Sequence, residues 1–94
     1  MSSHEQCHLY VGKAVEYVCT LGNRLPVTHV RMLLADPAFR HAEAAVEAAC
    51  LAGDVALTKS TCRAWWEVTR ATIERIQQRE TPPHQVETSK VFMV

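Results

Sequence analysis

Along most of this chain, apolar residues recur every three or four positions, which is the period of an amphipathic α-helix. Residues that favour helix ends separate the apolar stretches, so we expect four helices, at about residues 5–21, 26–35, 37–52 and 60–79. The expected fold class is therefore all-α: a compact four-helix domain over residues 1–79. A tail, residues 80–94, follows Glu80-Thr81-Pro82-Pro83, where the helical pattern breaks.

Each of the first three helices carries an apolar stripe that we expect to face the core. The stripes are Cys7, Tyr10, Val11, Ala14, Val18 and Leu21; Val27, Val30, Leu33 and Leu34; and Phe39, Ala42, Val46, Ala49 and Cys50. The four cysteines all lie on apolar sides of predicted helices, and the N-terminus lacks the pattern of a signal peptide. We therefore expect buried free thiols in a cytoplasmic protein.

The last predicted helix has two apolar stripes, whereas a surface helix of a monomer needs only one. The broad stripe is Cys62, Trp65, Trp66, Thr69, Ile73 and Ile76, and the narrow one is Ala64, Val68 and Ala71. The narrow stripe predicts contact with another chain, most simply in a homodimer. Of the two tryptophans, at least one must anchor the core, and its neighbour can reach a partner.

Two further segments have strand-like composition. Asp54–Leu57 reads as either a short strand or a linker, with Thr58 or Ser60 capping the helix that follows. Val91–Val94 is apolar and follows a polar stretch, so we expect it to dock, with Phe92 as its anchor, in the same subunit or in a partner. The two segments together could form one short β-hairpin.

The order of the first three helices, the sharp turn at Asp36-Pro37, Gly53 and the sequence DVAL resembles a winged helix-turn-helix over about Tyr10–Thr58. This resemblance implies a recognition helix in the DNA major groove and a β-wing after it. The DNA-contacting residues would be Arg24, Arg31, Arg40, His41 and Lys59. Glu43 and Glu47 depart from the pattern, because carboxylates on the recognition helix repel phosphates.

The amino-acid composition argues against several classes of function. The chain has 94 residues, of which 48% are hydrophobic and 21% are charged, and its 10 basic and 10 acidic residues balance. That balance offers no overall field that would attract nucleic acid or a membrane. With only three glycines there is no phosphate-binding loop, and no recognisable frame surrounds a nucleophile, so we expect no enzyme.

One group of side chains near the N-terminus has the spacing of metal ligands but is one ligand short of a structural zinc site. His4, Cys7 and His8 share one helix face at ligand spacing, but a structural zinc site needs a fourth ligand. We expect no cofactor and no metal requirement for folding. The function predicted from the sequence is a small non-enzymatic interaction protein, an adaptor, inhibitor or regulator that binds another macromolecule. Its size suits an accessory protein of a phage or a bacterium. The alternative is a winged-helix-like DNA-binding regulator.

Overall fold

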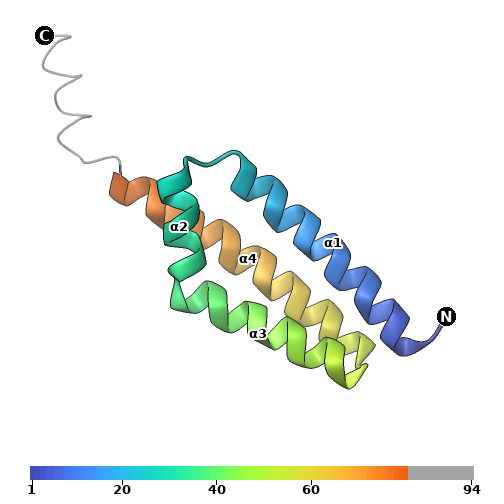
Figure 1. Cartoon of the computed structure of the whole chain (residues 1–94). Helices are drawn as coiled ribbons and strands as arrows, with labels where there is room; N and C mark the ends of the chain where they lie inside the picture. The colour runs from blue at the N-terminus through green and yellow to red at the C-terminus, as the bar shows by residue number, and fades with distance from the viewer. Residues whose placement is uncertain (81–94) are drawn as a thin grey trace, which may run out of the picture.

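A computed structural model describes residues 1–80, which form four helices (Figure 1). They are α1 (Ser3–Asn23), α2 (Val27–Ala35), α3 (Pro37–Ala52) and α4 (Val55–Glu80). The all-α class and the four-helix count predicted from the sequence are confirmed. The predicted docking of Val91–Val94 through Phe92 lies outside the described residues.

Local side-chain contacts determine where the helices begin. Ser2 caps α1: its Oγ accepts from the Glu5 amide at 3.2 Å, and its hydroxyl donates to Glu5 Oε1 at 3.3 Å. Asp36 caps α3, because its Oδ1 accepts from the amides of Ala38 and Phe39 at 2.9 and 3.1 Å. Pro37 occupies the first turn of α3, where its missing amide hydrogen costs nothing.

The start of α4 corrects the prediction for Asp54–Leu57. Gly53 ends α3 with φ +69°, and Asp54 at once begins α4 by accepting from the Leu57 amide at 3.0 Å. Residues 55–57 are therefore the first turn of a helix, and a strand or β-wing at this position is wrong. The sequence pattern misled because an alternating tetrapeptide is too short to distinguish a strand from a helical turn that follows an N-cap.

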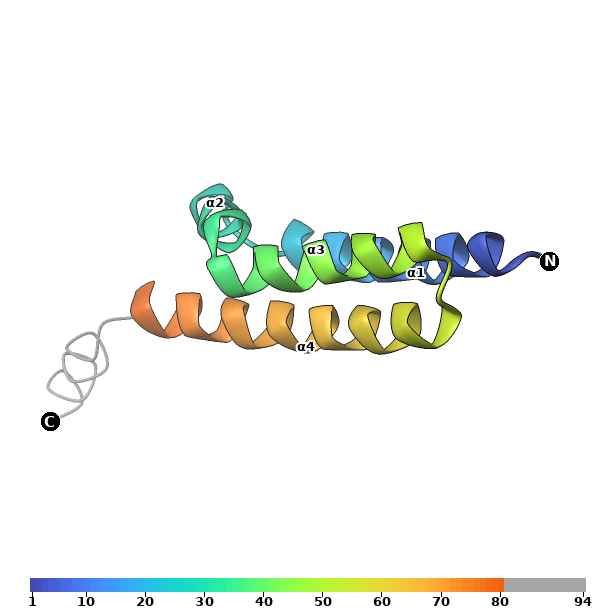
Figure 2. The same cartoon turned by 90° about the horizontal axis from the view of Figure 1, so that it is seen from below.

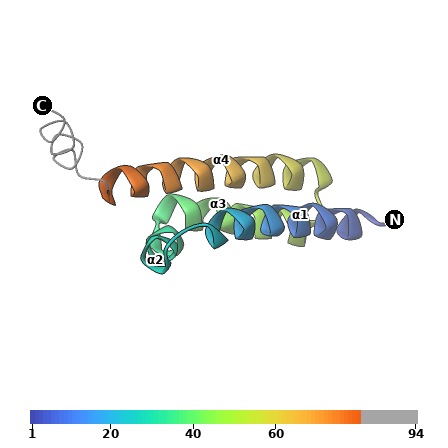
Figure 3. The same cartoon turned by 90° about the horizontal axis from the view of Figure 1, so that it is seen from above.

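The three long helices form two layers. In Figure 2, α1 lies behind α3 in one layer and α4 lies beneath both, while α2 runs crosswise at one end. Figure 3 shows the same two layers from the opposite side. Contacts join Cys7 to Thr58 and Tyr17 to Trp66, so α1 and α4 run in the same direction. The helix α4 contacts both of its long neighbours more extensively than they contact each other.

This central position of α4 is visible in its sequence. Its buried positions follow one another at alternating intervals of four and three residues: Thr58, Cys62, Trp65, Thr69, Thr72 and Ile76. Such a seam is typical of a helix that packs lengthwise against its neighbours. The threonine hydroxyls are satisfied within the core; for example, Thr69 donates to the Trp65 carbonyl at 2.7 Å and Thr58 donates to Cys7 Sγ at 3.3 Å.

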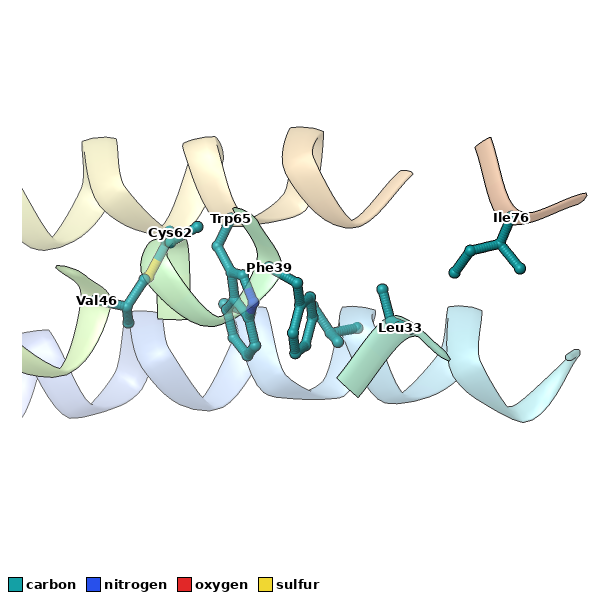
Figure 4. Packing of buried hydrophobic residues seen from close by; sticks show 9 residues of the cluster. Leu33, Phe39, Val46, Cys62, Trp65 and Ile76 are labelled. Carbon is teal, nitrogen blue, oxygen red and sulfur yellow. The ribbon is translucent and has the colours of Figure 1, made fainter. Parts of the chain in front are cut away.

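The core is centred on two aromatic rings. Trp65 and Phe39 are 4% and 1% exposed, and their ring centroids lie 5.7 Å apart (Figure 4). Leu33 from α2, and Val46 and Cys62 from α3 and α4, extend the same cluster. The predicted stripe of α3 is buried as a whole, and that of α1 is buried or half-buried.

Two predictions about individual residues are wrong. In α2 only Leu33 is buried, while Val27 and Leu34 are exposed, because this short helix presents a single face to the long helices. Cys19 is exposed, although the other three cysteines are buried. Among the described residues only Gly53 adopts a positive φ.

Candidate functional site

A groove between α1 and α4 brings aromatic and basic side chains together. It encloses a cavity of about 220 Å³, and its lining residues are Tyr10, Lys13, Lys59, Cys62, Arg63 and Trp66. We call it the α1–α4 groove. Its α4 members are spaced as i, i+3, i+4 and i+7, which is one face of a helix, and Tyr10 and Lys13 are neighbours on α1. The lining is mostly apolar, with the charged groups as its polar part.

Aromatic rings form the hydrophobic part of this groove. Trp66 is half-buried, and its ring centroid lies 5.1 Å from that of Tyr17 on α1, with the planes tilted by 43°. Its indole N–H is buried and has no acceptor within residues 1–80. Because tryptophan and tyrosine offer large apolar area at little cost in side-chain entropy, they are favoured anchors in protein interfaces.

Three cations surround these rings. Lys13, Lys59 and Arg63 are all exposed, and the Lys59 ammonium lies 5.2 Å from the centre of the Tyr10 ring, within cation–π range. The ion pairs found in the described part of the chain are Arg40–Glu43 and Arg75–Asp36, so none of the three cations is neutralised at short range there. Although the whole chain is neutral, the residues that line the groove include three cations and no carboxylate.

The thiol in the groove is not activated by this positive charge. Burial raises the pKa of the Cys62 thiol above its ordinary value, and the neighbouring thiols of Cys50 and Cys7 raise it further. Cys62 is therefore protonated near neutral pH. Because the thiolate is the nucleophilic form, this arrangement favours packing over covalent chemistry.

The size of the groove indicates what it can hold. A dry apolar cavity of about 150 Å³ accommodates a benzene molecule, whereas pockets for drug-sized ligands begin at about 300 Å³. At about 220 Å³, the α1–α4 groove matches a single bulky apolar side chain. Carboxylates next to that side chain would meet the three cations.

The residues predicted to bind a partner fall into different environments. Trp65 belongs to the core, Trp66 lines the groove, and Phe92 lies outside the described residues. In the narrow stripe, Ala64 and Ala71 are exposed, but Val68 is half-buried and packs against the core cluster. The stripe is therefore not a continuous apolar surface on the outside of α4.

The residues predicted to contact DNA come from several elements. Arg24 and Arg31 belong to the α1–α2 turn and to α2, and Arg40 and His41 to the start of α3, whereas Lys59 belongs to the first turns of α4 and lines the α1–α4 groove. Arg40 is also engaged by Glu43 at 4.0 Å and by the Leu34 carbonyl at 3.4 Å.

The three candidate metal ligands do not converge. His4 Nε2 lies 3.3 Å from the Leu51 carbonyl, Cys7 Sγ accepts from Thr58, and His8 Nδ1 lies 3.8 Å from Cys50 Sγ. Within residues 1–80, no three ligand-type side chains gather closely enough to hold a metal ion. Packing of α1 against the other helices separates side chains that share one face in the sequence pattern.

Sequence reasoning missed the α1–α4 groove for an identifiable reason. The sequence pattern places the start of the last helix near Ser60, which leaves Lys59 outside this helix. A helix starting at Val55 places Lys59, Arg63 and Trp66 on one face. The pairing of this face with Tyr10 and Lys13 depends on the parallel packing of α1 and α4, which periodicity does not reveal.

Comparison of the chain with protein-family models, with curated proteins and with solved structures found no match. Of the helices described here, none combines the length and the apolar character that crossing a bilayer requires.

Proposed function

We propose that this chain is a small non-enzymatic protein-binding module that recognises a partner protein through the α1–α4 groove. The observation that carries the proposal is the combination, in one groove, of a half-buried tryptophan, a tyrosine and three cations, with no carboxylate in the lining and no ion pair to these cations within residues 1–80. The partner segment would present one bulky apolar side chain with acidic residues beside it.

The two parts of the groove would contribute differently to binding. Exposed ion pairs are worth only about 0.2–1 kcal/mol each. Burial of an apolar side chain against Trp66 and Tyr10 contributes about 1.5–3 kcal/mol and would supply most of the affinity. The cations would mainly accelerate association and reject basic competitors.

A pull-down from the native host tests this function. The baits are the wild type, the groove variant Lys59→Glu/Arg63→Glu and the control variant Arg70→Glu, which changes an exposed arginine outside the groove. We expect the wild type and the control to capture the same protein, the groove variant to lose it, and nuclease treatment to have no effect. Capture that is equal for all three baits would contradict the proposal.

Nuclease treatment also tests the DNA-binding alternative. The DNA-binding alternative predicts three results: nuclease treatment removes the captured material, the variant Arg24→Glu/Arg31→Glu fails to capture it, and the groove variant still captures it. Together they would show that the protein binds DNA through α2 and its flanking turn. Arg24 and Arg31 are both exposed, so DNA could reach them.

A purified system gives a direct readout of the groove. The probe is a ten-residue peptide of glutamate and aspartate around one leucine, and the control is the same peptide with the leucine replaced by serine. We expect the first peptide to shift the indole N–H resonance of Trp66 and leave that of Trp65 in place. No shift at millimolar peptide would contradict the proposed recognition.

A further inference from the structure

The most exposed large hydrophobic side chain in the described part of the chain is Leu51, at the end of α3. It is 83% exposed, more than any other such side chain among residues 1–80. Glu47 lies one helical turn before it on the same face. Asp54 follows three residues later, after the turn at Gly53, where its Oδ1 accepts from the Leu57 amide. Neither carboxylate takes part in an ion pair within the described residues. We call Leu51, Glu47 and Asp54 the Leu51 knob.

The Leu51 knob has the chemistry that the α1–α4 groove selects. It presents one bulky apolar side chain with carboxylates beside it, whereas the groove presents a cavity for one such side chain surrounded by Lys13, Lys59 and Arg63. We infer that a second copy of this chain is an occupant of the groove: Leu51 of one copy enters the α1–α4 groove of the other. This inference rests on the proposed function and names a partner for it.

The positions of knob and groove allow a reciprocal contact. His4 near the start of α1 contacts the Leu51 carbonyl, so the start of α1 meets the end of α3, and α4 begins there too (Figure 1). Knob and groove therefore lie toward the same end of the bundle. Leu51 also lies beside His8 and Val11 of α1, the helix that forms one wall of the groove. In the inferred dimer a two-fold axis at that end would relate the two knob-in-groove contacts, which would close a dimer instead of propagating a chain.

This dimer differs from the one that the narrow stripe of α4 predicts. A dimer through that stripe would use Ala64 and Ala71, which are exposed but carry no charge and lie outside the groove. The reciprocal dimer instead depends on Glu47 and Arg63. The two arrangements are therefore distinguished by single substitutions of exposed residues.

Sedimentation equilibrium of the full chain between 10 µM and 1 mM tests the inference. We expect the mass of the wild type to rise from that of a 10.5 kDa monomer toward twice that value. Glu47→Lys and Arg63→Glu should each weaken association at least tenfold, because each places like charges at both contacts. An equimolar mixture of the two variants should recover it, since every contact then joins opposite charges. Ala71→Glu is the matched control and should change nothing.

Three results would overturn the inference: a wild type that remains monomeric at 1 mM, association that Ala71→Glu abolishes while Glu47→Lys does not, or a mixture that fails to recover. The peptide titration separates this failure from failure of the proposed function. If the wild type is monomeric but the acidic leucine peptide still shifts the Trp66 resonance, the groove binds another partner and only self-association is wrong.

Discussion

At the scale of single residues, Gly53 combines two constraints in the turn between α3 and α4. Its φ of +69° lies in the left-handed region, and an added Cβ would come within 2.7 Å of the His4 imidazole. The first constraint should dominate, because His4 is an exposed side chain that can move away. We therefore expect Gly53→Ala to lower the free energy of unfolding by about 1–2 kcal/mol.

Urea denaturation of Gly53→Ala in the wild-type and His4→Ala backgrounds tests this ranking. The same loss in both is expected. A loss that largely disappears in the His4→Ala background would show that the imidazole, held near the Leu51 carbonyl, is the stronger constraint.

The raised pKa of Cys62 predicts how the stability of the protein depends on pH. Because its folded-state pKa is raised, the protonated thiol contributes stability that is complete below its ordinary pKa of 9.0 and is lost as the pH rises through the higher folded value. At pH 7.5, iodoacetamide should modify the exposed Cys19 well before Cys62, as mass spectrometry can show. In urea the two should react alike. Equal rates in the folded protein would contradict the buried, protonated thiol.

At the scale of elements, the corner between α2 and α3 depends on Asp36. This side chain caps α3, and its Oδ2 also lies 3.5 Å from Arg75 Nη2 of α4. We expect Asp36→Ala to cost about 1–2 kcal/mol in unfolding free energy, mostly through the cap. Asp36→Asn keeps a capping oxygen. Arg75→Ala leaves the cap intact and removes the half-exposed ion pair and the hydrogen bond that Arg75 Nη2 donates to Thr72 Oγ1 at 3.0 Å. We expect each to cost less than about 1 kcal/mol. Urea denaturation should show the largest loss of unfolding free energy for Asp36→Ala. A loss from Arg75→Ala as large as that from Asp36→Ala would contradict this expectation.

The two sides of α4 should respond differently to a new charge. Val68→Glu places a carboxylate against the core cluster, so we expect it to destabilise the monomer by more than about 1 kcal/mol. Ala71→Glu adds the same charge at an exposed site and should change the unfolding free energy by less than about 0.5 kcal/mol. Thermal unfolding at low protein concentration measures both. Equal effects would show that Val68 is free of the core.

At the scale of the whole molecule, the two adjacent tryptophans have separate roles. Both indole N–H groups are buried without an acceptor in the described region. Replacement of either tryptophan by phenylalanine therefore removes one buried, unsatisfied donor, with a similar effect on the free energy of unfolding at both positions. Trp65→Phe also leaves a void beside Phe39 and should cost about 1 kcal/mol or more. Trp66→Phe, in the open groove, should stay within about 0.5 kcal/mol. Urea denaturation measures the loss of unfolding free energy for both variants. A larger loss for Trp66→Phe than for Trp65→Phe would show that Trp66, and not Trp65, anchors the core.

Local sequence determined the helices themselves. Apolar residues at intervals of three and four, the capping residues Ser2 and Asp36, and Gly53 at the end of α3 act over one or two turns. Such short-range effects can be read from the chain without knowing what lies opposite. This is why the all-α class and the buried stripe of α3 were predictable, and why the ambiguous tetrapeptide after Gly53 was not.

The tertiary structure decided which of these helix faces meet. The α1–α4 groove depends on two helices that run parallel although 31 residues separate the end of α1 from the start of α4, so that Tyr10 lies beside Lys59. The same packing half-buries Val68 against the core and directs His4, Cys7 and His8 to three different partners. Periodicity specifies which side of a helix is apolar, but the partner of that side depends on how all four helices share one core.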